Sequence, residues 1–219
     1  MIYLIADIHG EYDLFIKLLA KINFNPAEDK LYILGDVVDR GKDPIKTLQY
    51  IYDNQDSIIL LKGNHEQMMI DTIVNGNYYL WFYNGGRITY DEYINLSEEQ
   101  QDKLFNYINN LPCIQQIEVN NKKYILAHAG VEVGHNGQIL EMQDQDFLLW
   151  AREEFFNNTE IVNDVTVIVG HTPTVNLHKS DLIWYSNCGK KICIDCGAVF
   201  GFKLACLRLD DMKEFYINK

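Results

Sequence analysis

The sequence predicts an α/β fold, and three observations carry that prediction. Five short apolar runs are each followed by a turn that contains glycine, a pattern typical of buried strands. Segments with apolar residues at helical spacing follow several of these runs. Each run also leads to a residue that could bind a metal, and sheets built from strand-loop-helix units gather such residues beyond the carboxyl ends of their strands.

The five apolar runs span residues 2–6, 31–34, 57–61, 124–127 and 165–169. Because adjacent strands end at one edge of a sheet, we expect the polar residues that follow them to converge. Asp7 and His9 are two positions apart, so they point the same way if the chain stays extended there. The candidate metal ligands are Asp7, His9, Asp36, Asn64, His128 and His171.

Four helices are predicted in the first half of the chain, one of them after His65, where helical spacing resumes. Residues 11–22 carry an apolar stripe of helical spacing after the first strand. Asp43 followed by Pro44 predicts an N-cap and a helix that continues to about residue 53. Ser97 with Gln100 predicts a capping box at the start of a helix that extends to about residue 109.

The second half of the chain is richer in predicted strands. Residues 114–119 and 123–127 flank an Asn120-Asn121 turn and predict a hairpin. A helical segment is expected at about residues 146–156, followed by the strand at 165–169. Two further strands are predicted at 191–195 and 202–209.

Composition limits the classes of protein to consider. The chain has 219 residues, and its candidate ligands are spread from Asp7 to His171, so we expect one catalytic domain over residues 1–219. A formal net charge of -12 argues against a nucleic-acid partner, because such partners require clustered Lys and Arg. We expect no membrane partner either, since no apolar run approaches the length of a membrane span.

The expected location is the cytoplasm. The apolar run at the amino terminus stops at Asp7, which is too short for a signal peptide, and no basic segment precedes it. The five cysteines are odd in number and lack the spacing of a disulfide framework, which favours free thiols in a reducing compartment.

The glycine-containing blocks, taken in order, resemble those of the PPP-type serine/threonine phosphatases of bacteria and phages, within the calcineurin-like metallophosphoesterases. The resemblance covers about residues 1–206, and five blocks in the family's order make it specific. Ala6 departs from the pattern, because many relatives have glycine before the first aspartate. The resemblance implies a sandwich of two mixed β-sheets flanked by α-helices.

The resemblance also implies two divalent metal ions. It assigns Asp7, His9 and Asp36 to the first ion, with Asp36 as a bridge. It assigns Asn64, His128 and His171 to the second ion. Oxygen and nitrogen ligands without thiolates favour Mn, Fe or Zn, and the likeness to bacterial members favours Mn²⁺ among them. Paired ions lower the pKa of a water between them and hold the phosphoryl group for in-line attack.

Further roles follow from the same resemblance. His65 matches the acid that protonates the leaving alkoxide, and Asp39 matches the carboxylate that orients and charges its imidazole. Arg40 and Arg152 match the arginines that bind the substrate phosphate together with Asn64, since a guanidinium offers planar paired donors.

The function expected from these assignments is hydrolysis of phosphoserine and phosphothreonine in proteins or peptides, with phosphotyrosine as a further candidate, by a water that two metals activate. The alternative is symmetrical diadenosine tetraphosphate hydrolysis or another nucleotide phosphoesterase activity. Enzymes of that kind typically have a non-acidic residue at the position of Asp39, which favours the phosphatase. A non-catalytic binding module is disfavoured, because every ligand and the acid are present.

Structural roles are the interpretation preferred for the remaining conspicuous residues. His135 and His178 lie outside the blocks and are expected to be structural. Cys193 and Cys196 are three apart on a predicted strand, so they face opposite sides and form neither a disulfide nor a metal site. The segment with Trp81, Asn84, Gly85 and Gly86 resembles a family block of structural or substrate-groove character.

Overall fold

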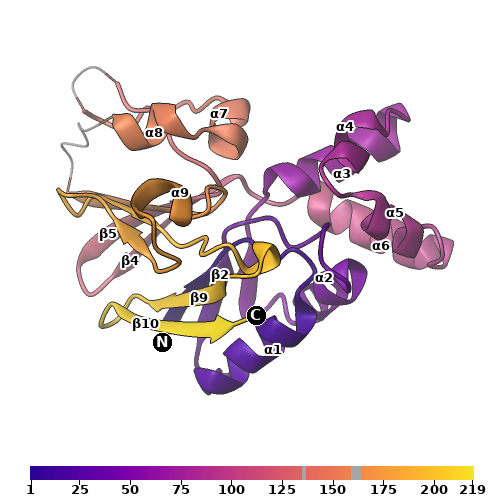
Figure 1. Ribbon diagram of the computed structural model, residues 1–219, viewed down its shortest axis with the longest axis horizontal. Helices are drawn as coiled ribbons and strands as arrows, with labels where there is room; N and C mark the ends of the chain where they lie inside the picture. The colour runs from indigo at the N-terminus through magenta and orange to yellow at the C-terminus, as the bar shows by residue number, and fades with distance from the viewer. Residues whose placement is uncertain (135–136, 159–163) are drawn as a thin grey trace.

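Two five-stranded sheets form the centre of the computed structural model, which describes residues 1–134, 137–158 and 164–219 (Figure 1). The first sheet has the order β10 (Lys213–Asn218), β9 (Lys203–Arg208), β1 (Ile2–Ile5), β2 (Lys30–Ile33) and β3 (Ile58–Leu60). The second has the order β4 (Ile114–Val119), β5 (Lys122–Ala127), β6 (Val165–Val169), β8 (Lys191–Cys193) and β7 (Trp184–Tyr185). In the first sheet β1, β2 and β3 are parallel and β9 and β10 pair antiparallel, whereas the second sheet has parallel central pairs and antiparallel edges. The predicted pair of mixed sheets is confirmed.

Alternating side chains of the strands build separate apolar layers. On β1, Leu4 packs in a cluster shared by both sheets, whereas Tyr3 and Ile5 face the helices that cover the first sheet. On β5, Leu126 joins the shared cluster, and Ile125 packs on the outer side of the second sheet. This alternation follows from the two-residue period of a strand, and it makes the molecule a sandwich with helices on its outer faces.

The helices divide between the two sheets (Figure 1). The first sheet's side carries α1 (Tyr12–Lys21), α2 (Pro44–Asp53), α3 (Asn64–Asn75), α4 (Tyr79–Tyr83), α5 (Arg87–Tyr93) and α6 (Glu98–Asn109). The second sheet's side carries α7 (Gln145–Trp150), α8 (Glu153–Asn157) and α9 (Val175–His178), and a short helix η1 (Ala198–Phe200) precedes β9. Within the described part of the chain, no helix has both the length and the apolar character needed to cross a bilayer.

Local sequence signals account for most of these boundaries. The capping box at α6 is confirmed, because the backbone N–H of Gln100 donates to Oγ of Ser97 at 3.3 Å. Asn120 and Asn121 adopt left-handed φ values of 51° and 60°, as a tight hairpin turn requires. Asp43 occupies the N-cap of α2, but its side chain makes no capping hydrogen bond within the described residues.

The prediction of one helix over residues 146–156 is wrong. The chain forms α7 and α8 instead, and it breaks at Ala151, whose ψ of 141° is extended. The break turns Arg152 toward the loop after β6, where its guanidinium finds hydrogen-bond acceptors. β7 and β10 were not predicted from the sequence, because β7 has two residues and β10 lacks a fully buried face.

Candidate metal centre

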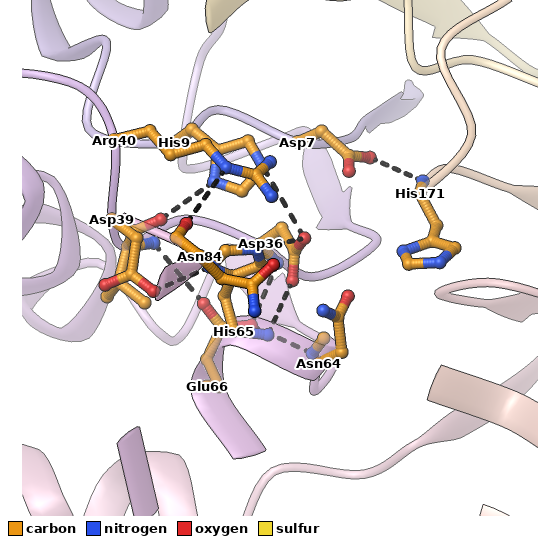
Figure 2. A network of polar contacts seen from close by, with 12 residues as sticks. Asp7, His9, Asp36, Asp39, Arg40, Asn64, His65, Glu66, Asn84 and His171 are labelled. Carbon is orange, nitrogen blue, oxygen red and sulfur yellow. Dashed lines mark hydrogen bonds and ion pairs between the residues drawn. The ribbon is translucent and has the colours of Figure 1, made fainter. Parts of the chain in front are cut away.

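The polar residues that follow the strands meet at one end of the sandwich, between the two sheets. Asp7 follows β1, Asp36 follows β2 and Asn64 begins α3 directly after β3. His128 and His171 follow β5 and β6 of the second sheet. All of the predicted metal ligands are buried, and Figure 2 shows most of them facing a common centre.

Left-handed backbone is concentrated at this centre. Such φ values cost non-glycine residues about 1–3 kcal/mol each unless surrounding structure holds them, and they gather at functional sites. Because Asp7 and His9 are both left-handed, the expectation of an extended chain between them is wrong. The non-glycine residues of the site with positive φ are Asp7 (51°), His9 (45°), Asp36 (53°), Asp39 (71°), Arg40 (66°) and His171 (63°).

Asp36 links two clusters of potential ligand atoms. The first cluster contains His9, Asp36 and His65, and the second contains Asp36, His128 and His171. Its Oδ2 lies 3.5 Å from Nε2 of His9 and 3.9 Å from Nε2 of His65. Its Oδ1 lies 3.4 Å from Nε2 of His128, which belongs with His171 to the second cluster. Burial acts to raise the pKa of Asp36, but the surrounding histidines lower it below its usual range. One oxygen therefore faces each cluster, which is the geometry of a bridging carboxylate.

His9 presents a defined lone pair to the first cluster. Its Nδ1 donates to the carbonyl oxygen of Val38 at 2.9 Å, so Nε2 is the acceptor of the neutral ring, and Nη1 of Arg40 donates to it. Burial and the nearby His65 keep the pKa of His9 well below its ordinary value. A neutral imidazole fixed in this way is suited to bind a metal.

The second cluster has converging lone pairs of the same kind. Nδ1 of His128 donates to the carbonyl oxygen of Leu34 at 2.7 Å, which leaves Nε2 as an acceptor. That Nε2 faces the side-chain oxygen of Asn64 at 2.8 Å and Nδ1 of His171 at 3.1 Å. Burial lowers the pKa of both His128 and His171. Among the described residues, no hydrogen-bond partner reaches the buried Nε2 of His171. Oxygen and neutral nitrogen donors arranged around a shared carboxylate fit a pair of divalent ions.

Asp7 lies beside the clusters. Its Oδ2 accepts a hydrogen bond from the backbone N–H of His171 at 2.9 Å, and so ties the loop after β1 to the loop after β6. Burial, with the charges of Asp195 and Asp36, raises the pKa of Asp7 well above its ordinary value. An added positive charge would relieve this repulsion between carboxylates, which favours a cation at this place.

Two glycines leave space for the carboxylates. A Cβ atom at Gly63 would lie 2.2 Å from Oδ1 of Asp36. A Cβ atom at Gly170 would lie 2.2 Å from Oδ2 of Asp7. The glycines of these blocks are therefore needed for close approach between backbone and ligand side chains.

His65 differs from the other histidines of the site. Its Nδ1 donates to Oδ2 of Asp39 at 2.6 Å, and both side chains are buried. Burial acts to lower the pKa of His65, but the attraction of Asp36 and the hydrogen bond to Asp39 outweigh it and raise that pKa. His65 is thus arranged to carry a proton, with Nε2 turned toward the clusters.

Sequence reasoning missed Glu66, which supports the whole centre. Its buried carboxylate accepts hydrogen bonds from the backbone N–H groups of Asp36 at 2.8 Å, Val37 at 2.9 Å and Gly63 at 2.9 Å. Burial and the charge of Asp36 raise its pKa to about 7. A capping-box pattern, with an acidic residue three positions after the N-cap, was the signal available for this residue. Asp195 was missed as well, and its charge acts on Asp7.

The two arginines lie at different parts of the site. Nη1 of Arg40 donates to Nε2 of His9 at 2.6 Å, and the two side chains are drawn in Figure 2. Arg40 is half-buried. Arg152 is exposed, and its Nη1 donates to the carbonyl oxygen of His171 and to Oγ1 of Thr172, both at 3.2 Å. Each guanidinium is thus next to one of the two clusters.

The residues expected to be structural behave differently from these. Nε2 of His178 donates to the carbonyl oxygen of Leu182 at 3.0 Å, away from the clusters, and His135 lies outside the described residues. Cys193 and Cys196 are buried free thiols that pack in different apolar clusters. Their opposite orientation agrees with the prediction that they form no disulfide.

Comparisons with known proteins point to one family. Residues 1–200 match the family model described as Calcineurin-like phosphoesterase. Serine/threonine-protein phosphatase 2 of Salmonella typhimurium is 32% identical over 178 residues, which are 78% of each chain. Serine/threonine-protein phosphatase 1 of the same organism is 29% identical over 212 residues, 95% of this chain and 91% of that protein. A symmetrical bis(5'-nucleosyl)-tetraphosphatase of Buchnera aphidicola is 32% identical over 168 residues, 72% of this chain and 58% of that protein.

Solved structures show the same fold. One provisionally described as a diadenosine tetraphosphatase has a TM-score of 0.72 at 18% identity, and the match covers 99% of this chain and 92% of that chain. A protein serine/threonine phosphatase from Saccharomyces cerevisiae has a TM-score of 0.65 at 16% identity, with 99% and 78% covered. Both likenesses extend along the sandwich and its helices.

Proposed function

This chain belongs to the calcineurin-like phosphoesterase family, and from that premise we propose that it is a phosphoprotein phosphatase for phosphoserine and phosphothreonine. The observation that carries the proposal is the buried pair of His65 and Asp39, whose atoms Nδ1 and Oδ2 are 2.6 Å apart. The alkoxide of a serine or threonine is a poor leaving group, so its departure requires a proton donor. The bacterial phosphatases at about 30% identity support the same substrate class.

The proposed cofactors are two divalent ions, with Mn²⁺ as the preferred metal. His9 and Asp36, with Asp7 beside them, would hold one ion, and Asp36, Asn64, His128 and His171 would hold the other. When bound, such a pair activates a water and orients the phosphoryl oxygens for in-line displacement. Neutral imidazoles with carboxylate and amide oxygens favour Mn, Fe or Zn over Ca.

The protein's own groups supply the rest of the reaction. Arg40 and Arg152, together with Asn64, bind the phosphoryl oxygens, since each guanidinium offers paired donors. Nε2 of His65 gives its proton to the leaving oxygen as the bond from phosphorus to that oxygen breaks. Asp39 holds the ring in the orientation and charge state that this transfer needs.

Symmetrical dinucleoside tetraphosphate hydrolysis is the second candidate, because relatives with that name are also 32% identical to this chain. A screen of the purified protein with Mn²⁺ separates the two candidates. Phosphoserine, phosphothreonine and phosphotyrosine peptides are compared with diadenosine tetraphosphate at equal concentration. We expect the phosphopeptides to be hydrolysed faster, and a preference for the dinucleotide would overturn the proposal.

The proposed partners are phosphorylated proteins or peptides, and the proposed location is the cytoplasm. All five cysteines are free thiols, and such thiols persist in a reducing compartment. The net charge of -12 disfavours a nucleic-acid partner, because binding to nucleic acid needs clustered cations.

A further inference from the structure

A single stretch of chain, residues 81–89, contacts both Asp39 and Arg40. It runs from Trp81 on α4 to Thr89 on α5, and we call it the clamp segment. Trp81 and Thr89 are buried at its two ends, and Asn84 lies in the turn between the helices. Figure 2 shows Asn84 next to Arg40. Metal binding and the proposed proton transfer use none of these three side chains.

The two ends of the clamp segment hold the carboxylate of Asp39. Nε1 of Trp81 donates to Oδ2 at 2.8 Å, the same oxygen that accepts from His65. Oγ1 of Thr89 donates to Oδ1 at 2.5 Å. Both carboxylate oxygens are therefore engaged, and the plane of the carboxylate is fixed with Oδ2 directed at the imidazole.

The middle of the clamp segment holds Arg40. The carbonyl oxygen of Asn84 accepts from Nε of Arg40 at 3.3 Å. The carbonyl oxygen of Gly85 accepts from the backbone N–H of Arg40 at 3.2 Å. The side chain and the backbone of the arginine thus both contact the turn between α4 and α5.

Asp39 and Arg40 need such support because both have left-handed backbone, with φ of 71° and 66°. A pair of strained residues persists only where its surroundings over-determine the conformation. The clamp segment accepts a hydrogen bond from the backbone N–H of each residue. Oγ1 of Thr89 accepts from the N–H of Asp39 at 2.9 Å, and the carbonyl oxygen of Gly85 accepts from the N–H of Arg40.

Two adjacent glycines make the contacts sterically feasible. A Cβ atom at Gly85 would lie 2.9 Å from Cγ of Arg40, and Gly85 itself has a φ of 95° that favours glycine. A Cβ atom at Gly86 would lie 2.2 Å from Nε1 of Trp81. Gly85 therefore leaves room for Arg40, and Gly86 leaves room for the indole that holds Asp39.

We propose that the clamp segment positions the proton donor and the phosphate-binding arginine together, with Trp81 and Thr89 acting on His65 through Asp39. They are positioning residues, because they touch Asp39 and not the reacting atoms. The inference rests on the proposed function, since it assumes that His65 protonates a leaving oxygen. It adds a role for a segment whose sequence resembles a family block of structural or substrate-groove character.

The test compares Thr89→Val with Thr89→Ser. Valine has nearly the shape of threonine but lacks the hydroxyl, whereas serine keeps it. With a phosphoserine peptide, Thr89→Val should lower kcat by about 10- to 100-fold, the usual effect of losing a partner behind an active-site histidine. Hydrolysis of p-nitrophenyl phosphate, whose leaving group needs little protonation, should fall much less. Thr89→Ser should retain most of the activity on both substrates.

Trp81→Phe provides a second route, because it removes the indole N–H and keeps an aromatic ring in the core. It should show the same selective loss on the phosphoserine peptide. Gly85→Ala should act instead on Arg40, and so raise KM and the inhibition constant of inorganic phosphate. These separate effects on kcat and KM would not result from a general loss of packing.

A measurement on the metal-free protein tests the contacts without activity. The protein has three tryptophans, and with ¹⁵N-labelled indoles the N–H of Trp81 should be shifted and protected from solvent exchange. Asp39→Asn should change that resonance and leave those of Trp150 and Trp184 in place.

An unchanged Trp81 resonance in Asp39→Asn would overturn the inference, as would Thr89→Val and Trp81→Phe variants that slow hydrolysis of both substrates equally. A wild-type protein that is inactive on both substrates would count against the proposed function. The indole resonance would still show whether Trp81 contacts Asp39, and so would test the clamp segment independently of activity.

Discussion

His65 and Asp39 share a hydrogen bond of 2.6 Å between Nδ1 and Oδ2, buried at the base of the candidate metal centre. The bond fixes which ring nitrogen carries the inner proton, because a carboxylate can only accept there. Nε2 is consequently the atom that faces Asp36 and the clusters. In the proposed function His65 therefore transfers a proton, whereas the adjacent Asn64 binds metal.

Substitutions at these adjacent positions should therefore have different effects. Asn64→Ala should weaken metal binding, measured by calorimetric titration with Mn²⁺, because its oxygen faces His128 in the second cluster. His65→Asn should retain the ions and lose about 10² to 10⁴ in rate on alkyl phosphates, the usual contribution of a general acid. The loss should be smaller for aryl phosphates, and equal losses on both would mean that His65 is not the proton donor.

Activity should depend on pH through His65. The donor is protonated below its pKa, so activity falls as the pH rises through that value, and the raised pKa moves this fall to higher pH. Asp39→Asn removes one cause of the raised pKa and should move the alkaline limb of kcat/KM to lower pH. His65→Asn serves as the control, because it should lack this limb altogether. An unmoved limb in Asp39→Asn would contradict the assignment.

Chelation should abolish hydrolysis of p-nitrophenyl phosphate, and Mn²⁺ should restore it. The same addition should raise the Tm of the chelated protein, since a ligand that binds only the folded state stabilises it. His171→Ala removes a member of the second cluster and should reduce the shift in Tm. His178→Ala is a matched control outside the clusters. Full activity in a protein shown to contain no metal would refute the two-ion proposal.

The arginines should affect phosphate binding without changing the metal content. Arg40→Ala and Arg152→Ala should each lower kcat/KM by about 10² or more, as for the loss of one electrostatic donor. Arg152→Lys keeps the charge without the paired donors and should recover part of the activity. Near-normal kinetics for Arg152→Ala would assign that exposed side chain to the solvated surface.

Much of the sheet architecture and the polar loops could be predicted from sequence, because buried strands with glycine turns leave a strong local signal. Asp36 shows the limit of that reasoning. Its bridging role was expected from the family resemblance, but the left-handed turn that directs one oxygen toward each cluster leaves no local signal in the sequence. Asp7 and His9 were expected on an extended chain, because their left-handed backbone also leaves no local signal in the sequence.

Contacts between distant segments account for most of what was missed. Thr89 is 50 positions from Asp39, and no local sequence motif around Thr89 predicts the contact between them. Glu66 has a capping signal, but its hydrogen bonds to the loop after β2 depend on the packing of α3. The helix break at Ala151 accompanies the contact of Arg152 with the loop after β6, which helical periodicity could not indicate.

The preference for phosphopeptides over dinucleotides should depend on Asp39. A nucleotide leaving group is stable as an anion and needs little help from a proton donor, whereas a serine alkoxide needs much. Asp39→Asn should therefore slow phosphoserine peptide hydrolysis more than diadenosine tetraphosphate hydrolysis and narrow the ratio between their kcat/KM values. Both substrates are measured in one Mn²⁺ buffer, with Asp181→Asn as a control outside the clusters, where Asp181 pairs with Lys203. If the wild-type protein prefers the dinucleotide and Asp39→Asn leaves the ratio unchanged, Asp39 does not set the substrate class, and symmetrical hydrolysis becomes the better interpretation.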